Sequence, residues 1–318
     1  MKHYFVLGMI FLLLLFTRIG QAQERLDLSA QIPIVAWYGI RANEATVERF
    51  KELKEAGFTI NFSEYSSLEE VEKALDAAHK VGVQLIIACP ELRKEPEKTV
   101  RKFMEHPAVA GYFLRDEPVV ADFTALGDWA KRIQAVDNRK FCYLNLFPTG
   151  GEEHLRFLGV QNYRDYITRF NKEVPLPFLS FDHYPVLGDN VLKAEWYENL
   201  EDFSDEARKI GKDFWAFALA TKHGPYPVPT RASLRLQLYS NLVYGAQGLQ
   251  YFTYWTPAGD SFYDYQHGPI GLDGKRTEVY DLVKDMNAEI RSIAGIFWGQ
   301  KFCRSDIQEV LYREVRHV

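Results

Sequence analysis

Eight short apolar runs constrain the fold of this chain more than any other feature of its sequence. Seven of the eight are nearly continuous in apolar residues rather than alternating with polar ones. That pattern is typical of parallel strands, because both faces of such a strand are covered. The expected strands span residues 33–40, 59–65, 84–90, 109–118, 140–148, 178–186, 213–221 and 248–255.

Segments with the periodicity of amphipathic helices lie between these runs. Val47, Phe50 and Leu53 form one apolar stripe, and similar stripes cover residues 68–78 and 279–293. Ser67 and Glu70 have the spacing of a capping box, which predicts that a helix begins there. Three expected helices are followed by a residue suited to the left-handed turn that ends a helix: Gly57, Gly82 and Gly211.

A strand followed by a helix therefore occurs eight times. Parallel strands joined by helices form either an open doubly wound sheet or a closed barrel. Trp37, Tyr38 and Gly39 close the first strand in place of a glycine-rich phosphate loop, which disfavours a dinucleotide site. Eight units in 318 residues favour a single-domain α/β protein, the (β/α)8 TIM barrel, over residues 30–300. Residues 301–318 form a strand-like tail, either an edge strand or the start of an incomplete β domain.

The first 22 residues are interpreted as a secretory signal peptide. Lys2 gives a basic start, residues 5–16 are apolar, and small residues at 20–22 offer a cleavage site. An uncleaved anchor is the less favoured alternative, because the apolar stretch is short for a membrane span and Arg18 interrupts it. We therefore expect a secreted or periplasmic protein without a membrane span after cleavage.

Charge and cysteine content exclude several classes of function. The net charge is −5 and becomes −7 when the leader, which holds Lys2 and Arg18, is removed. Such an acidic chain does not suit a binder of nucleic acid or of anionic membranes. Cys89, Cys142 and Cys303 are too scattered for a disulfide framework or a zinc site, so core packing is expected for the first two. The sequence implies no cofactor.

Polar and aromatic side chains gather at the ends of the expected strands, where barrel enzymes build their sites. Carboxylates with aromatic walls suit sugars, because rings cover the C–H faces of a sugar and polar groups hold its hydroxyls. The candidate substrate-binding residues are Trp37, Glu64, Asp116, Asn145, His183, Tyr184 and Trp255. For His183 the alternative is a hydrogen-bonded residue of the wall. Long connections at 149–163 and 256–276 follow strands five and eight on the same face.

The sharpest local signal is the segment 111–118, Gly-Tyr-Phe-Leu-Arg-Asp-Glu-Pro, in which two carboxylates close an apolar strand. A carboxyl group walled by aromatic rings can have a raised pKa and act as a general acid while its neighbour stays ionised. Glu117 is therefore the candidate catalytic acid. In the structural alternative, Arg115 pairs with Asp116, and Glu117 caps the next helix.

This segment resembles the fourth strand of clan A glycoside hydrolases. That clan includes the barrel domain of family 42 β-galactosidases, whose pattern at this point is Asn-Glu-Pro. The chain is also similar to secreted glycoside-hydrolase-like barrels of Bacteroidetes, through residues 181–185, the aromatic eighth strand and residues 271–277. The resemblance implies a TIM barrel, a β-galactosidase-like glycosidase acting on an oligosaccharide or polysaccharide, and Glu117 as the acid/base residue.

Two positions depart from the clan's pattern. Asp116 replaces an Asn that donates to the sugar 2-hydroxyl, and strand seven carries no carboxylate where the clan has its nucleophilic Glu. Asp182 is the favoured second catalytic carboxylate, as base or nucleophile, with Glu64, Asp260 and Asp264 as alternatives. Separations of about 5–5.5 Å indicate a retaining pair and about 6.5–9.5 Å an inverting pair. No metal is expected, although Asp116, Asp182 and Glu64 together would suit Ca²⁺.

The leading expectation is a secreted glycoside hydrolase. One alternative is a non-catalytic carbohydrate-binding barrel that has lost the strand-seven Glu. Another is a polysaccharide lyase, with Tyr184 or His183 as base and Arg115 or Lys222 on a uronate. The sugar, the linkage and the oligomeric state stay open.

Overall fold

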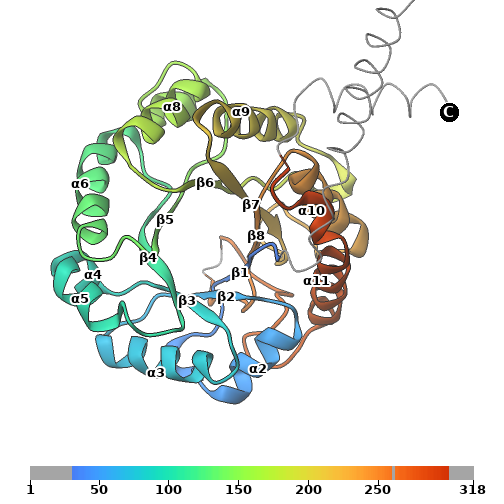
Figure 1. Ribbon diagram of the computed structural model, residues 1–318. Coiled ribbons are helices and arrows are strands. Elements are labelled where there is room, and N and C mark those ends of the chain that lie inside the picture. Colours follow the sequence, from blue (N-terminus) through green and yellow to red (C-terminus); the bar gives the residue numbers. More distant parts are fainter. Residues whose placement is uncertain (1–30, 260–261, 301–318) are drawn as a thin grey trace, which may run out of the picture.

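The structure is a computed structural model that describes residues 31–259 and 262–300. It shows an eight-stranded, all-parallel barrel (Figure 1). The strands are β1 (Ile34–Trp37), β2 (Ile60–Phe62), β3 (Gln84–Ile87), β4 (Val109–Asp116), β5 (Phe141–Asn145), β6 (Phe178–Phe181), β7 (Asp213–Leu219) and β8 (Gly248–Phe252). All eight expected strands are confirmed. Each expected range runs past the observed end, because the residues there leave the sheet to form the loops of one face.

Helices surround the barrel as an outer layer (Figure 1). They are α2 (Val47–Glu55), α3 (Leu68–His79), α4 (Pro90–Lys94), α5 (Pro96–Phe103), α6 (Phe123–Gln134), α7 (Glu152–Leu158), α8 (Tyr163–Glu173), α9 (Glu195–Ile210), α10 (Arg231–Val243) and α11 (Glu278–Phe297). Short 3-10 turns are η1 (Ala42–Glu44), η2 (Val120–Asp122) and η3 (Gly188–Asn190). The connection after β5, expected only to be long, contains α7.

Hydrogen bonds run round the sheet in the order β5-β4-β3-β2-β1-β8-β7-β6. The ring closes between its two ends just beyond β5, where the Leu146 N–H donates to the Ser180 carbonyl oxygen at 2.8 Å. Leu146 and Phe181 form a single parallel bridge there. The (β/α)8 architecture predicted from the repeat is therefore confirmed, with one narrow seam between β5 and β6.

Alternate residues of each strand face two different cores. Along β1, Val35 and Trp37 belong to the cluster that fills the barrel, whereas Ile34 and Ala36 belong to the larger cluster between strands and helices. Barrels require this alternation, since successive strand side chains point to opposite faces. The barrel cluster is rich in rings, and Phe178 stacks on Trp215 with centroids 4.1 Å apart.

Local signals in the sequence are confirmed with one change. The Ser67 hydroxyl accepts a hydrogen bond from the Glu70 N–H and begins α3. The Glu70 carboxylate, however, accepts from the Ser66 N–H at 2.6 Å, one residue before the position that a capping box requires. The three helix-ending glycines all have positive φ, as predicted: Gly57, Gly82 and Gly211.

Some expectations fall on residues that the structure does not describe, namely the leader, the tail from 301, Cys303 and Asp260. Secretion therefore stays a prediction. Within residues 31–259 and 262–300, no helix combines the length and apolar character that a membrane span needs. Cys142 is buried and Cys89 half-buried, both as free thiols, in agreement with the expected packing role.

Candidate active site

A cavity of about 370 Å³ opens at the carboxyl ends of the strands. It gathers residues from β1, β4, β5, β7 and β8, from the loops that follow several of these strands, and from the loop after β6. Its lining consists of Trp37, Tyr38, Asp116, Glu117, Asn145, Pro148, Asp182, His183, Tyr184, Lys193, Phe217, His223, Tyr226, Phe252, Tyr263 and Tyr265. Carboxyl groups gather on one side of this cavity, and tyrosines make up much of the rest.

Glu117 stands at a sharp backbone turn directly after β4. Its φ is 45°, a left-handed value that is uncommon for a residue with a side chain. The Glu117 N–H donates to the Asn145 carbonyl oxygen at 2.9 Å, so the turn is fixed to the end of β5. The next residue, Pro118, is fixed to α8, because the Tyr166 hydroxyl donates to the Pro118 carbonyl oxygen at 2.6 Å. This turn presents the half-buried Glu117 side chain to the cavity.

Three carboxyl groups meet in the cavity, and their pKa values all rise. Burial, and then the charges of Asp182 and Asp116, raise the pKa of Glu117 to about 9. The pKa of Asp116 rises to about 7. The main cause is desolvation of its carboxyl group by the surrounding protein, although part of the residue is exposed, and the next cause is the charge of Asp182. The interaction with Asp182 favours the protonated form of Glu117. At neutral pH Glu117 is thus protonated and can act as an acid beside Asp182, whose pKa burial also raises.

A chain of buried polar groups beneath the carboxyls fixes Asn145. The Ser180 hydroxyl donates to Asn145 Oδ1 at 2.9 Å, while Gln250 Nε2 donates to Ser180 Oγ at 2.8 Å. Because its oxygen is occupied, Asn145 must turn its amide hydrogens toward the carboxyls. Asn145 Nδ2 lies 2.7 Å from Asp182 Oδ1 and 3.4 Å from Asp116 Oδ1. Asn145 therefore acts as a donor that stabilises the charge on Asp182.

Arg115 does not neutralise these acids. Its guanidinium pairs with Asp122 at 3.1 Å, on the segment that leads into α6. The structural alternative in which Arg115 pairs with Asp116 is therefore wrong, and Glu117 keeps access to the cavity.

His183 and Tyr184 follow Asp182 and occupy different surroundings. His183 is 4% exposed, and its Nδ1 lies 2.9 Å from Asn199 Oδ1, an acceptor, so Nδ1 carries the hydrogen. Burial lowers the pKa of His183 to about 4, which keeps the ring neutral. The Tyr184 hydroxyl is hydrogen-bonded to Asp182, and burial raises its pKa well above the ordinary value.

The remaining wall of the cavity is an aromatic cage around His223. The His223 ring centroid lies 4.9 Å from that of Tyr226, 5.1 Å from Tyr265 and 5.5 Å from Phe252. Tyr265 also stacks on Tyr263 at 5.5 Å. These loop residues were missed as candidates, apart from His223 and Tyr263, which stood out as polar or aromatic residues near strand ends. Their only signal is the density of tyrosines in 226–265.

Two predicted site residues lie outside the cavity. Trp255 is 3% exposed and sits between two cations, with Arg41 Cζ 4.7 Å and Arg49 Cζ 5.1 Å from its ring centroid. It is not available as a sugar platform. Glu64 is exposed and lines a neighbouring hollow of about 580 Å³, although its charge still contributes to the raised pKa of Asp116.

The end of β7 lacks a carboxylate, as the sequence indicates. Thr221 stands there instead, and its hydroxyl lies 2.8 Å from that of Thr253. In the eighth loop Asp264 is exposed and paired with Lys222 at 3.1 Å. Among the candidates for a second catalytic carboxylate that the structure describes, which are Glu64, Asp182 and Asp264, Asp182 is therefore the one that lines the cavity with Glu117.

The described residues include no group of three or more His, Cys, Asp or Glu side chains arranged to hold a metal ion. The Ca²⁺ site considered for Asp116, Asp182 and Glu64 thus finds no support in the geometry.

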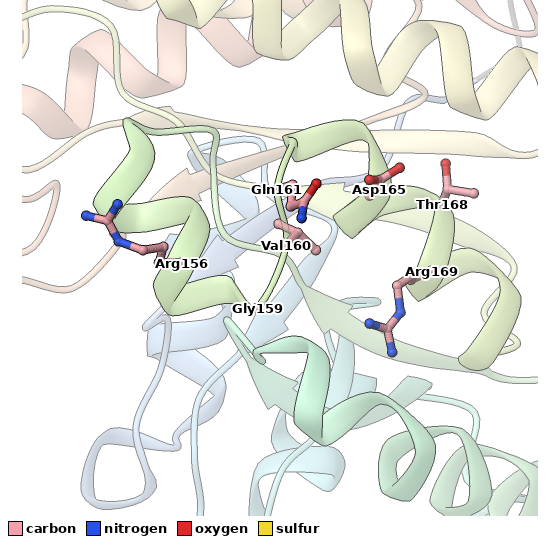
Figure 2. Close-up of a pocket in the computed structure, with 7 residues that line it drawn as sticks. All are labelled: Arg156, Gly159, Val160, Gln161, Asp165, Thr168 and Arg169. Atoms are coloured by element: carbon pink, nitrogen blue, oxygen red, sulfur yellow. The ribbon is translucent and has the colours of Figure 1, made fainter.

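Figure 2 shows another hollow, of about 610 Å³, on the outer layer between α7 and α8. Arg156 pairs with Glu152 and Arg169 with Glu173, each on its own helix. This hollow lacks the convergent carboxyl groups of the barrel cavity, so the chemistry is assigned to the cavity at the strand ends.

Comparison with known proteins agrees with the fold. No protein-family profile and no curated protein sequence matches the chain. Among solved structures, the β-galactosidase of the psychrophilic Marinomonas ef1 matches with a TM-score of 0.57 at 12% identity, over 84% of this chain and 60% of that one. The β-galactosidase of the Antarctic haloarchaeon Halorubrum lacusprofundi gives 0.57 at 13% identity, over 82% and 58%. The endo-β-1,4-mannanase of Thermotoga petrophila gives 0.53 at 13% identity, over 84% and 78%.

These likenesses show a barrel of the kind found in clan A glycoside hydrolases, which confirms the predicted resemblance at the level of the fold. The chain spans less than two thirds of the length of either β-galactosidase.

Proposed function

We propose that this barrel hydrolyses a glycosidic bond and that Glu117 is its general acid. The observation that carries the proposal is a carboxyl group that holds its proton at neutral pH within an aromatic-walled cavity at the strand ends. A general acid needs a pKa near or above the working pH, and burial with neighbouring charge provides it. The glycoside hydrolases with similar barrels support the same class of reaction.

The first step is protonation of the departing oxygen. The protonated Glu117 interacts with Asp182 in the cavity. A bound sugar takes the place of Asp182 by placing its glycosidic oxygen against Glu117. The C–O bond breaks as this oxygen takes the proton, and positive charge develops on the sugar ring.

Asp182 is then left as a free carboxylate beside the reacting carbon. It stabilises the positive ring, and it either activates a water or attacks the anomeric carbon. Hydrogen-bonded carboxyls lie closer together than the about 5–5.5 Å of a retaining pair. In the proposed mechanism, substrate binding separates Glu117 from Asp182, and the distance that they reach decides whether the reaction retains or inverts.

Substitution of Glu117 tests the proposal. We expect Glu117→Gln to lower kcat on oligosaccharides by about 10²–10⁴-fold, since an amide cannot supply the proton. With 2,4-dinitrophenyl glycosides the loss is smaller, because that leaving group departs without protonation. Glu153→Gln, at an exposed carboxyl on α7, is the matched control and should keep full activity. Equal rates for Glu117→Gln and the parent would contradict the proposal.

A non-catalytic carbohydrate-binding barrel is the second candidate, favoured by Thr221 at the place of the clan's nucleophile. It predicts oligosaccharide binding by the parent without turnover. The lyase alternative loses its proposed cations, because Arg115 and Lys222 are both paired with carboxylates away from the cavity. Its base is also weak, since the raised pKa of Tyr184 opposes ionisation.

A further inference from the structure

Lys193 places a positive charge in the cavity, on the loop after β6. The loop folds back on itself: Val186 and Leu192 form an antiparallel bridge, and the Lys193 N–H donates to the Pro185 carbonyl oxygen at 2.9 Å. Gly188 N–H also donates to Pro225 O at 3.1 Å and so ties this loop to the one after β7. The position of Lys193 is therefore fixed by backbone contacts on both sides.

The Lys193 ammonium has a neutral partner. Its Nζ donates to the Tyr226 hydroxyl at 2.7 Å. Among the residues that the structure describes, no Asp or Glu oxygen lies within 4.0 Å of this nitrogen. An ammonium has three hydrogens to donate, so two remain for a ligand. Keeping a cation half-buried without an anion costs solvation energy that a bound anion would restore.

The charges of the cavity are separated by two rings. Tyr184 is hydrogen-bonded to Asp182 at the acidic end, and its ring centroid lies 5.7 Å from that of Tyr226. Tyr226 in turn holds Lys193. Tyr184 and Tyr226 thus connect the carboxyl groups of the cavity to the ammonium.

From this arrangement we infer that the substrate is an acidic sugar and that Lys193 binds its anionic substituent, a carboxylate or a sulfate. The inference rests on the proposed glycosidase function and specifies its substrate class. An uncharged sugar would leave the ammonium without an anion, whereas a uronate or sulfated sugar gives it one. Lys193 is thus a specificity-determining residue, separate from the carboxyls that do the chemistry.

A binding experiment tests this inference without turnover. The probes are uronate oligosaccharides, the same oligosaccharides after chemical reduction of their carboxyl groups, and sulfated and neutral glycans on one array. The full chain with Glu117→Gln is the reference protein. We expect binding to acidic probes at least about 10-fold tighter than to their reduced counterparts, because a hydrogen bond to a charged group is stronger than one to a neutral group.

Substitutions at Lys193 then separate recognition from general folding. Lys193→Gln should abolish the preference for acidic probes, and Lys193→Arg should retain part of it. Lys222→Gln, on the next loop and paired with Asp264, is the matched control and should keep the preference. The uronate and sulfate arms identify the anionic group.

Neutral glycans bound as well as acidic ones, or an acidic preference that survives Lys193→Gln, would overturn the inference. Its failure is distinguishable from that of the proposed function. Glu117-dependent turnover of neutral glycosides, without any preference for acidic ones, would support the proposed hydrolase function and contradict the acidic-substrate inference. Lys193-dependent binding of acidic glycans, without turnover by the parent protein, would support the acidic-ligand inference and contradict the hydrolase function.

Discussion

Glu117 and Asp182 interact across the ends of β4 and β6, and this interaction favours the protonated form of Glu117. Asn145 stabilises Asp182 from below with an N–H that lies 2.7 Å from Asp182 Oδ1. Glu117 is therefore the member of the pair that holds a proton at neutral pH. The pH dependence of activity follows from its titration.

The alkaline limit of activity should depend on Asp182. Glu117 is active while protonated, so hydrolysis should fall as pH rises through its pKa of about 9. Removing the Asp182 charge lowers that pKa, because a neighbouring anion disfavours ionisation. The substrates are aryl glycosides whose leaving group needs protonation. In Asp182→Asn we expect the alkaline limb of the residual kcat/KM to move to lower pH by about one unit or more. An alkaline limb at the same pH in both proteins would argue against the pair.

Glu117 should also cost stability at high pH. Its pKa is about 9 in the folded protein, against about 4.3 in an unfolded chain. The folded state thus holds the proton more tightly, so the contribution to stability is complete below the unfolded pKa and is lost as pH rises through the folded one. Glu117→Gln should therefore gain about 1–3 kcal/mol relative to the parent between pH 5 and pH 8. Denaturant unfolding of both proteins at pH 5 and pH 8 measures this gain. The same difference in the free energy of unfolding at both pH values would refute the prediction.

Asn145 should support both stability and the charge on Asp182. Asn145→Ala leaves the Ser180 hydroxyl and Asp182 without their partners at 2.9 and 2.7 Å. We expect a loss of about 1–3 kcal/mol in the free energy of unfolding. Asn138→Ala, at an exposed position, should change little in the same measurement. A loss no greater than that of this control would mean that the chain of polar groups is not coupled to folding.

Gly111, on β4, should be required for packing. A Cβ on Gly111 would lie 2.4 Å from both the Phe141 carbonyl oxygen and a carbon of its ring. We expect Gly111→Ala to destabilise the barrel by about 1–3 kcal/mol through this overlap. At Gly151 a Cβ would meet nothing within 4 Å, so Gly151→Ala is the control in thermal unfolding. Equal midpoints for the two variants would contradict the steric argument.

Much of the candidate site could be predicted from local sequence. The errors of that prediction have a common cause. Glu117, Asp116, Asn145, Asp182 and Tyr184 end strands, and parallel strands in a barrel bring all such ends to one rim. Strand alternation, by contrast, does not say how a residue past the strand end turns. Trp255 shows the consequence, since two arginines from the first helical unit cover a ring that the pattern placed in the site.

The sequence alone determined the eight strand-helix units, the barrel and the acid at the end of the fourth strand, because periodicity and strand-end chemistry are properties of adjacent residues. Tertiary structure decided which groups meet. The interaction of Glu117 with Asp182, the donor direction of Asn145 and the place of Lys193 beside Tyr226 all join segments that are far apart in the chain. Such contacts arise when the barrel closes and the loops fold over its rim, and the path of those loops depends on long-range packing and hydrogen bonds that no local pattern encodes.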